Sequence, residues 1–383
     1  MRAELEPLGS SYDVVVANPP YMGSSSLGRW MSAWVKKRYP EAYRDLCTSF
    51  IDRGFSLSRT DGYSAMVTMQ SWMFLGSFER LRGKILRGHS ISSMAHLGTR
   101  AFGQIAGEVV STTATVFANA KSEVGGAYFR LVDMGSEAEK QAGLLEALAD
   151  PNCGWFYRRD ADTFRQIPGS PIAYWASDAM LGAFTNGISI DEVSDYTGSP
   201  NITGDNGSYL RLFWEVSSNE VSNKWVPYSK GGEFRRWYGN LIHVVDWTQT
   251  ARQHYASNQT STLLPEKYWY KGGITYTMLT SGKACFRHID NGCIWDKSGP
   301  VICSLGTLEP IWLAYLNGSV AQLYLDFLNP TMNLQVKDVK SLPFLPIDDS
   351  NSIISLTRNN ISISKGDWDS FEISRNFKRH PLI

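Results

Sequence analysis

The sequence lacks a surplus of either charge, because its 383 residues contain 37 Lys and Arg and 37 Asp and Glu. It therefore does not carry the overall basic excess of many nucleic-acid-binding proteins, although basic residues can still gather on one face. It also has no apolar run long enough to span a membrane and no basic-then-apolar leader. Cysteine is scarce, with five residues at irregular spacing, which favours reduced thiols. We expect a cytoplasmic globular protein with no membrane contact.

Several catalytic signatures are missing as well. The sequence has no HExxH, no GxSxG elbow, no Walker loop and no convincing nuclease cluster of carboxylates and lysine. Cys285, His288, Cys293 and Cys303 could be considered as zinc ligands, but their spacing contains no tight CxxC pair and the local pattern alternates as in strands. We therefore expect no metal site.

The most informative motif present is Asn18-Pro19-Pro20-Tyr21, which directly follows the apolar run 14–17. The Asn18 side-chain oxygen and the Pro19 carbonyl can each accept a hydrogen bond from an exocyclic amine, and neither proline can donate one. The Tyr21 ring can stack on a planar base. A strand that ends in this motif is typical of enzymes that methylate planar nitrogens, whereas the simpler alternative is a strand followed by a proline turn.

The position of this motif in the chain is unusual. A methyltransferase catalytic domain needs a glycine-rich loop after its first strand to hold S-adenosylmethionine, and that loop normally precedes the motif by several strands. Only 17 residues precede Asn18, and they contain no such loop. We therefore expect the later half of a catalytic domain, followed by other sequence.

Residues 12–120 alternate between strand and helix patterns. Strands are expected at 12–17, 63–69, 91–97 and 109–117, and helices at 24–39, 40–58 and 78–86; the first of these helices could also be a partly ordered segment over the site. This order predicts a mostly parallel sheet with an antiparallel edge at its end. A helix is expected at 135–149, short strands separated by turns from 154 onward, and a helix at 309–328. After 346 we expect polar chain that is loosely ordered in part.

At the motif and just after it, the chain resembles adenine-specific DNA methyltransferases of the gamma type. Over nearly its whole length it resembles the PglX-type methyltransferases of BREX phage-defence systems and related restriction–modification fusion enzymes. The resemblance is carried by Asp45-Leu46-Cys47 with Phe50, GWF at 154–156, PIAYW at 171–175, TGDN at 203–206, KGGEFRRWYGN at 230–240, GGITY at 272–276, LNPTMN at 328–333, WDSFE at 368–372 with Phe377, and HPL at 380–382. Full-length members of this family extend further at both ends.

The resemblance implies an α/β fold in which a partial Rossmann-like methyltransferase sheet, built from the later strands, precedes an α+β target-recognition domain. The expected parts are 1–120 for the C-terminal half of the catalytic domain, 121–153 for a linker and helix, 154–347 for target recognition, and 348–383 for the start of a C-terminal extension. S-adenosylmethionine is the implied cofactor, and double-stranded DNA and other subunits of the defence system are the implied partners.

The implied reaction transfers a methyl group to N6 of an adenine that has been extruded from the duplex. Asn18, Pro19, Pro20 and Tyr21 are then the catalytic residues. In the target-recognition part, the candidate DNA-binding residues are Lys230, Arg235, Arg236, Trp237 and Tyr238, since Lys and Arg suit phosphates and Arg also suits guanine edges. The alternative for these residues is a solvated turn with a buried Trp.

Two other functions remain open from the sequence. The chain could be a non-catalytic DNA-recognition subunit, or a truncated enzyme that needs an N-terminal part in trans. It could also methylate glutamine in a protein or a base in RNA, because such enzymes share the Asn-Pro-Pro-aromatic motif. The long aromatic-rich region and the stretch 230–240 favour DNA over these substrates.

Overall fold

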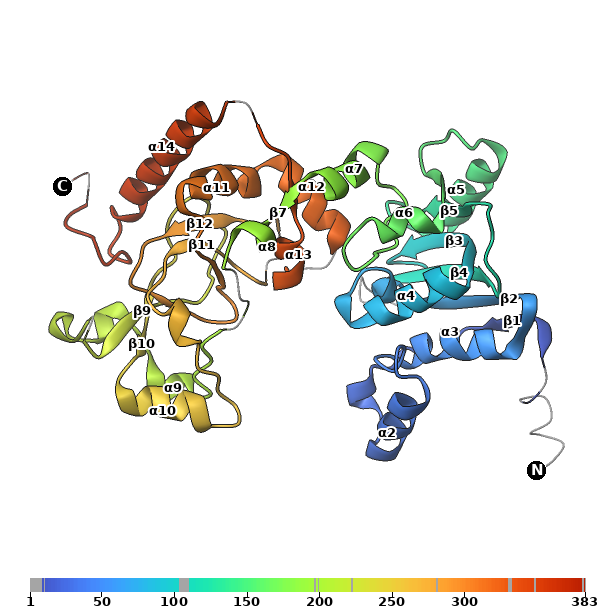
Figure 1. Cartoon of the computed structure of the whole chain (residues 1–383), viewed down its shortest axis with the longest axis horizontal. Coiled ribbons are helices and arrows are strands. Elements are labelled where there is room, and N and C mark those ends of the chain that lie inside the picture. Colours follow the sequence, from blue (N-terminus) through green and yellow to red (C-terminus); the bar gives the residue numbers. More distant parts are fainter. Residues whose placement is uncertain are drawn as a thin grey trace. The chain divides into compact units, whose positions relative to one another are not determined.

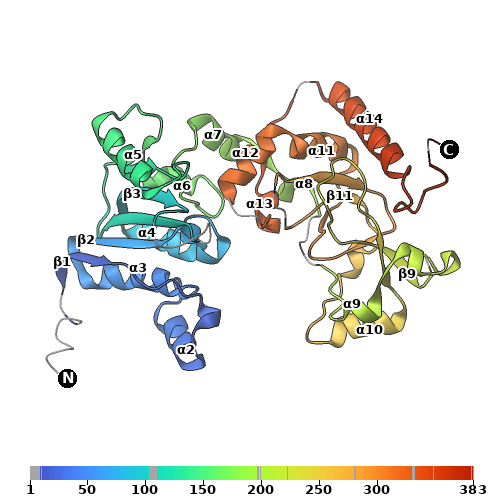
Figure 2. The same ribbon diagram turned by 180° about the vertical axis from the view of Figure 1, so that it is seen from behind.

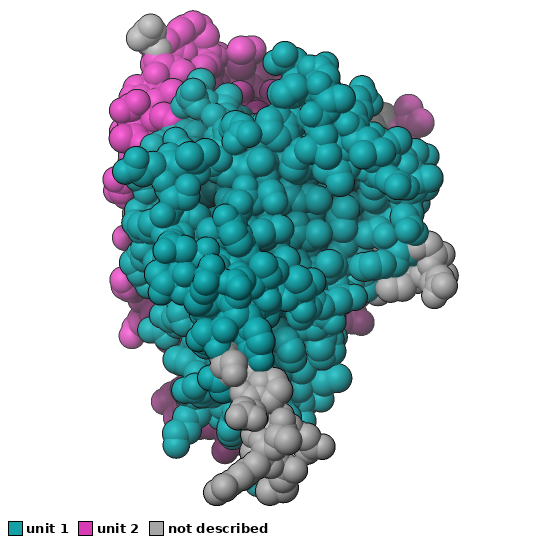
Figure 3. Space-filling model, turned by 90° about the vertical axis from the view of Figure 1, so that its right-hand side faces the viewer, with its two compact units in different colours: residues 1–181 teal, residues 182–383 magenta. Residues whose placement is uncertain are grey.

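The computed structural model describes residues 9, 11–102, 110–195, 198, 200–221, 223–279, 282–329, 333–347, 349–380 and 382. Val109, at the start of an expected strand, and Pro330, Thr331, Met332 and Pro381, within stretches that carry the resemblance, lie outside the described residues. The chain divides into two compact units, Met1–Leu181 and Gly182–Ile383, coloured separately in Figure 3.

The first unit is a mixed α/β structure around a six-stranded sheet (Figure 1). Its strands are β1 (Tyr12–Ala17), β2 (Ser58–Met69), β3 (Ser90–Gly98), β4 (Thr112–Ala118), β5 (Gly126–Arg130) and β6 (Phe156–Arg159). Its helices are α2 (Arg29–Arg38), α3 (Leu46–Leu57), α4 (Glu79–Gly88), α5 (Glu137–Ala149) and α6 (Ala161–Arg165), with 3-10 turns η1 (Ser24–Ser26), η2 (Gln70–Met73) and η3 (Gly76–Phe78).

The strand order is β1-β2-β4-β3-β5-β6. The pairs β1–β2 and β3–β5 are parallel, whereas β4 runs antiparallel to both of its neighbours and β6 runs antiparallel to β5. Four of the six strands, β1, β2, β3 and β5, therefore run in the same direction within a mixed sheet. The placement of the fourth strand at the edge is wrong, because β4 lies between β2 and β3. Periodicity reveals that a strand exists, but the order of strands depends on long-range pairing that the pattern does not encode.

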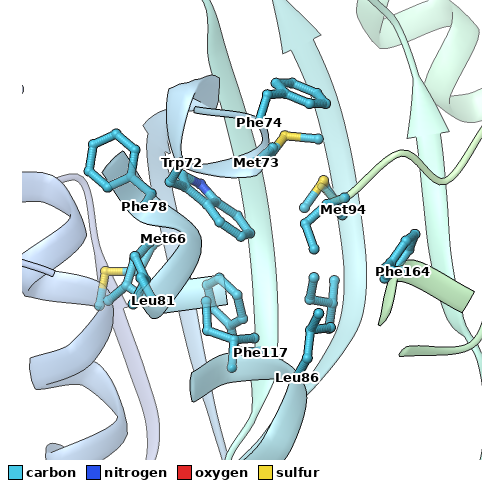
Figure 4. Close-up of a cluster of buried hydrophobic side chains, with 14 of the residues drawn as sticks. Met66, Trp72, Met73, Phe74, Phe78, Leu81, Leu86, Met94, Phe117 and Phe164 are labelled. Atoms are coloured by element: carbon cyan, nitrogen blue, oxygen red, sulfur yellow. The ribbon is translucent and has the colours of Figure 1, made fainter. Parts of the chain in front are cut away.

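The core of this unit lies on one face of the sheet, under α3 and α4. Figure 4 shows the large side chains that meet there: Met66, Trp72, Met73, Phe74, Phe78, Leu81, Leu86, Met94, Phe117 and Phe164. Val15 and Ala17 of β1 also pack against this cluster, whereas the intervening Val16 points to the other face and is 75% exposed. The alternation of β1 thus buries one side of the strand that leads into the motif.

The other face of the sheet is covered by α5 in the region of β3 and β5, where Phe129, Leu131 and Ala147 form a smaller core. Nearer to β1 the same face carries an apolar hollow of about 380 Å³, whose lining includes Val16 and Val67.

The second unit consists of small sheets and helices. Its strands are β7 (Ile188–Ser189), β8 (Leu210–Leu212), β9 (Trp225–Ser229), β10 (His243–Asp246), β11 (Gly273–Tyr276), β12 (Phe286–Ile289), β13 (Ile294–Trp295), β14 (Val301–Ile302) and β15 (Pro343–Phe344). They form sheets of order β13-β9-β10-β8, β12-β11-β14 and β15-β7. Helix α7 (Asp178–Asn186) crosses the unit boundary; the others are α8 (Ile190–Val193), α9 (Asn206–Tyr209), α10 (Gln249–Ser257), α11 (Glu309–Asn317), α12 (Ser319–Leu328), α13 (Val336–Lys340) and α14 (Ser350–Trp368).

Two helices differ from the expectations. The helix expected at 309–328 is interrupted at Gly318, whose extended backbone (φ −79°, ψ 163°) separates α11 from α12. The chain after 346, expected to be loosely ordered in part, contains the long helix α14, which lies along α11 (Figure 2). Its first turn is capped by the Asp349 carboxylate, which accepts a hydrogen bond from the backbone of Ser352 at 3.2 Å.

Candidate active site

The motif Asn18-Pro19-Pro20-Tyr21 begins one residue after β1 ends at Ala17. Because β1 and β2 are parallel and Ala17 pairs with Met66, the motif lies at the carboxyl edge of this strand pair. Ligands of open α/β sheets bind at this edge. Pro19 is buried and Tyr21 half-buried, whereas Asn18 and Pro20 are exposed, so the Asn18 amide is accessible to a ligand.

The motif is attached to the start of α3 by hydrogen bonds. The Asp45 carboxylate accepts one from the backbone N–H of Met22 at 3.3 Å and one from that of Cys47 at 2.9 Å. The second bond is the N-cap of α3. Leu46 in turn donates its N–H to the Met22 carbonyl at 2.9 Å. These contacts fix the position of Met22, which directly follows Tyr21, and thereby the position of the last residue of the motif.

Tyr21 points back toward Asn18. Its hydroxyl donates a long hydrogen bond of 3.4 Å to the Asn18 side-chain oxygen. Burial raises the pKa of Tyr21, and the nearby Cys47 thiol raises it further, so the hydroxyl remains a donor at neutral pH. The Cys47 thiol is itself buried, and its pKa is raised well above its ordinary value, so it is not a thiolate nucleophile. The chemistry that this edge offers is hydrogen-bond acceptance by oxygen together with an aromatic face.

The five candidate DNA-binding residues lie together in the second unit, but several have intramolecular partners. Lys230 pairs with Asp296 at 3.1 Å. Arg235 pairs with Asp367 and stacks over the Trp368 ring at 5.0 Å. Both partners are far away in sequence and neutralise much of the charge that the cations could offer to phosphates.

The remaining three candidates form the surface on which the end of α14 docks. Arg236 lies over the Phe234 ring at 5.6 Å. Trp237 has a left-handed backbone (φ 73°) and exchanges backbone hydrogen bonds with β12. The Tyr238 ring faces the Lys365 ammonium at 4.8 Å, and Ser364 donates its hydroxyl to the carbonyls of Arg236 and Tyr238. A role of this stretch in DNA binding stays a prediction.

The residues considered as zinc ligands have other contacts. His288 lies between two carboxylates, with Nδ1 at 2.5 Å from Glu309 and Nε2 at 3.2 Å from Asp290. Burial lowers the pKa of His288, but the hydrogen bonds and charges of these carboxylates outweigh it and raise the pKa to about 9. Among the described residues, no group of three or more His, Cys, Asp or Glu side chains is arranged to hold a metal ion.

Sequence reasoning missed the role of Asp45 in the site. Its signal was present, because Asp followed by an apolar helical pattern is a typical N-cap. A helix was expected to begin at residue 40, before this N-cap. In the structure α3 begins at Leu46, because Asp45 caps it. Residues 41–44 instead form turns.

Comparison with known proteins finds similar sequences of one kind. A family model described as Eco57I restriction-modification methylase matches residues 6–102, which include the motif. The adenine-specific methyltransferase PglX of Lacticaseibacillus casei (strain Zhang) is 36% identical over 403 residues, covering 98% of this chain and 33% of that protein. Over nearly its whole length, the chain is similar to part of a PglX-type adenine-specific methyltransferase. The adenine-specific methyltransferase BrxX of Escherichia coli O9:H4 (strain HS) is 36% identical over 390 residues, covering 98% of this chain and 31% of that protein.

The chain thus spans about a third of the length of these PglX-type relatives. Among solved structures, the Type IIL restriction-modification enzyme MmeI in complex with DNA superposes with a TM-score of 0.58 at 10% identity, over 95% of this chain and 50% of that one. The DrdV–DNA complex superposes with a TM-score of 0.50 at 11% identity, over 92% and 44%. At this identity the two structures establish likeness of fold alone.

Among the described residues, no helix has both the length and the apolar character that crossing a membrane requires.

Proposed function

We propose that this chain is part of a DNA methyltransferase that methylates N6 of adenine in double-stranded DNA within a phage-defence or restriction–modification system. The observation that carries the proposal is the position of Asn18, which is exposed at the carboxyl edge of β1 directly before a buried proline. The PglX and BrxX relatives, both named as adenine-specific methyltransferases, support this reading over a non-catalytic recognition subunit. Other subunits of such a system are further proposed partners.

In the proposed reaction, Asn18 and Pro19 orient the acceptor nitrogen. The adenine leaves the base stack, at a cost of a few kcal/mol, and enters the edge of the sheet beside β1. Its two amine hydrogens are donated to the Asn18 side-chain oxygen and to the Pro19 carbonyl oxygen. These two bonds fix the amine plane and draw positive charge away from the nitrogen, which favours its attack on an electrophilic methyl group. Orientation of this kind supplies much of the rate.

Pro20 and Tyr21 complete the proposed pocket. Pro20 keeps the loop rigid because its ring fixes φ. Tyr21 offers its ring to the face of the adenine, and its hydroxyl, at 3.4 Å from the Asn18 oxygen, holds the amide with that oxygen turned toward the ring. The amide nitrogen of Asn18 is then directed away from the acceptor amine.

S-adenosylmethionine is the proposed methyl donor, but the residues after β1 do not fit it. Gly23 and Gly28 are the first glycines after the motif, with ordinary φ values of −60° and −56°. An added Cβ would meet nothing closer than 3.9 Å at Gly23 and nothing within 4 Å at Gly28. Neither glycine has the left-handed backbone of a tight glycine-rich turn, and the space beside both is open. The described residues beside the motif fit the acceptor side of the reaction.

The proposed architecture follows from the same relatives. We propose that the six-stranded sheet of the first unit is the later part of a Rossmann-like methyltransferase sheet. The expected target-recognition part, 154–347, falls mostly in the second unit, so we propose that this unit reads the DNA sequence.

The experiment that tests the proposal identifies the methylated product. The purified chain is incubated with S-adenosylmethionine and adenine-containing duplex DNA, alone and together with the remaining part of the L. casei PglX expressed separately. The DNA is then digested, and the nucleosides are analysed by mass spectrometry. We expect N6-methyladenine in at least the supplemented reaction. Methylated cytosine, or methyl transfer to protein or RNA in preference to DNA, would contradict the proposal.

A further inference from the structure

The segment between the motif and α3 has a charge unlike that of the rest of the chain. Residues 22–44 contain Arg29, Lys36, Lys37, Arg38 and Arg44 but a single acid, Glu41, whereas the whole chain has equal numbers of acids and bases. Four of these cations belong to α2. The neutral total therefore conceals a local concentration of positive charge next to the proposed catalytic loop.

These cations are available to a ligand. All five are exposed, and among the described residues none of them lies within ion-pair distance of a carboxylate. The single acid, Glu41, faces Lys84 of α4 at 3.8 Å. Lys36 and Arg44 lie over the Tyr43 ring, at 5.6 and 4.8 Å. This contrasts with Lys230 and Arg235, whose charges have partners within the second unit.

The same helix exposes two large aromatic rings. Trp30 is 73% exposed and Trp34 is 46% exposed, and the two rings stack with their centres 6.5 Å apart at an angle of 18°. Val35 is the one buried residue of α2. Tryptophan is on average highly buried in folded proteins. Two exposed tryptophan rings on one short helix therefore indicate an interaction site.

The ends of the segment are fixed at the proposed active site. Gly23 and Asp45 form an isolated β-bridge, and Ser24 donates its N–H to the Arg44 carbonyl at 2.9 Å. The chain thus leaves the motif, makes an excursion that carries α2, and returns to the cap of α3. Both ribbon views show α2 beyond α3, on the side away from the sheet (Figures 1 and 2).

We propose that residues 29–44 form a DNA-contact surface beside the catalytic loop. The proposal rests on the proposed function and extends it to residues that none of the sequence arguments assigned. The cations contact phosphates of the strand that carries the extruded adenine, and Trp30 and Trp34 stack on bases that lose a neighbour when the adenine leaves the helix. A protein partner fits less well, because lysine is depleted in protein–protein interfaces, whereas unpaired cations next to aromatic rings match an unstacked nucleic acid.

The test measures the affinity of the full chain for a fluorescein-labelled duplex by anisotropy at several salt concentrations. The charge variant is Lys36→Ala/Lys37→Ala/Arg38→Ala. Its matched control is Arg87→Ala/Lys121→Ala/Arg158→Ala, which removes three exposed cations of the same unit. Lys121 and Arg87 lie near the amino ends of β2 and β3, opposite to the edge with the motif. Melting curves check that both variants are folded.

We expect the charge variant to bind DNA more weakly and with a weaker dependence on salt. The slope of log K against log salt concentration should become less steep by about 1 to 3, because each lost phosphate contact reduces the slope by about 0.9. The control should keep the wild-type slope. A charge variant with the wild-type affinity and slope would overturn the inference, and so would a wild-type chain that does not bind the duplex at low salt.

The aromatic part is tested with Trp30→Ala/Trp34→Ala. We expect the affinity of this variant for a duplex that contains an abasic site to fall by about 5-fold or more. The slope of log K against log salt concentration should stay unchanged. If the wild-type chain is instead a dimer by light scattering, and this variant is a monomer with unchanged DNA affinity, the surface belongs to a second copy and the inference is wrong.

The methylation assay and the binding assay together distinguish failure of the proposed function from failure of the proposed DNA contact. Weakened binding by the charge variant, without any N6-methyladenine from the wild type even when it is supplemented with the remaining part of PglX, would contradict the function and leave the DNA contact standing. Normal methylation with unchanged binding by the charge variant would contradict the contact alone.

Discussion

Asp45 should couple the stability of α3 to the position of the proposed catalytic loop, residues 18–21. The residue is 9% exposed, and its carboxylate accepts hydrogen bonds from the backbones of Met22 and Cys47, at 3.3 and 2.9 Å. Asp45→Ala removes the N-cap, which costs about 1 kcal/mol of unfolding free energy. It also leaves the Met22 N–H without its acceptor, which costs about 0.5–1.5 kcal/mol. We therefore expect a total loss of about 1.5–2.5 kcal/mol. Asp45→Asn keeps the acceptor oxygen and should lose less than about 1 kcal/mol.

Two measurements separate stability from positioning. Urea unfolding followed by circular dichroism gives the loss of free energy, and hydrogen exchange gives the protection of the Met22 amide. That amide should exchange slowly in the wild type and in Asp45→Asn, but quickly in Asp45→Ala. Methyl transfer, measured where every variant is folded, should fall by about 100-fold in Asp45→Ala, because a displacement of about 1 Å is enough for such a loss.

The matched control is Ser136→Ala, which removes the N-cap of α5, a hydrogen bond of 3.3 Å to the backbone of Glu139. It should lose about 1 kcal/mol of stability with no change in methyl transfer or in Met22 exchange. If Asp45→Ala retains the wild-type protection of Met22 and normal transfer, the reasoning about this contact is wrong.

Three other changes have definite expected results. Tyr21→Phe should keep most of the methyl transfer because it loses only a hydrogen bond of 3.4 Å, whereas Tyr21→Ala should lose about 10-fold or more with the stacking ring; equal losses would refute the stacking role. The pKa of His288 is raised from 6.5 to about 9, so its protonated form stabilises the fold fully below pH 6.5, and this contribution disappears as the pH rises to about 9. The urea midpoint should therefore fall more between pH 6.5 and 9 in the wild type than in His288→Gln, and identical falls would contradict the assignment. Asp367→Asn should free Arg235 from its ion pair and speed amide exchange in the last turns of α14, and unchanged exchange would show that the pair does not hold the helix.

Local pattern predicted the elements around the motif well. The strand at 12–17 coincides with β1, and the helices at 78–86 and 135–149 overlap α4 and α5 closely, because each shows a regular apolar spacing. Strand order was not predictable in the same way. β4 has an ordinary strand pattern, but its insertion between β2 and β3 depends on pairings with residues far apart in sequence.

Helix α14 shows why tertiary contacts can override local propensity. Its sequence, rich in Ser and Asn, has few strong helix formers and predicted loosely ordered chain. The helix is stabilised instead by its Asp349 cap and by contacts near its C-terminal end, where Ser364 and Asp367 bond to the 235–238 stretch. Those partners are about 130 residues away in sequence, so no window of local sequence contains them.

The candidate site shows the same division. The motif itself could be identified from the sequence, because its chemistry is contained in four consecutive residues. The partner of Lys230 is Asp296, and that of Arg235 is Asp367, so the sequence could not show that these cations are already paired. The positive charge of α2 is visible in the local sequence. The balanced net charge of the whole chain conceals it, because that sum averages over all local clusters of charge.

The role of Asn18 as the acceptor of the adenine amine is tested most directly by one comparison. N6-methyladenine formed in duplex DNA is quantified for the wild type, for Asn18→Ala and for the control Asn152→Ala, an exposed Asn of the same unit. We predict that Asn18→Ala loses about 100-fold or more of the product at unchanged DNA affinity, a loss typical of removing a group that stabilises developing charge, and that Asn152→Ala remains active. Normal formation of N6-methyladenine by Asn18→Ala would contradict the proposed function of the motif.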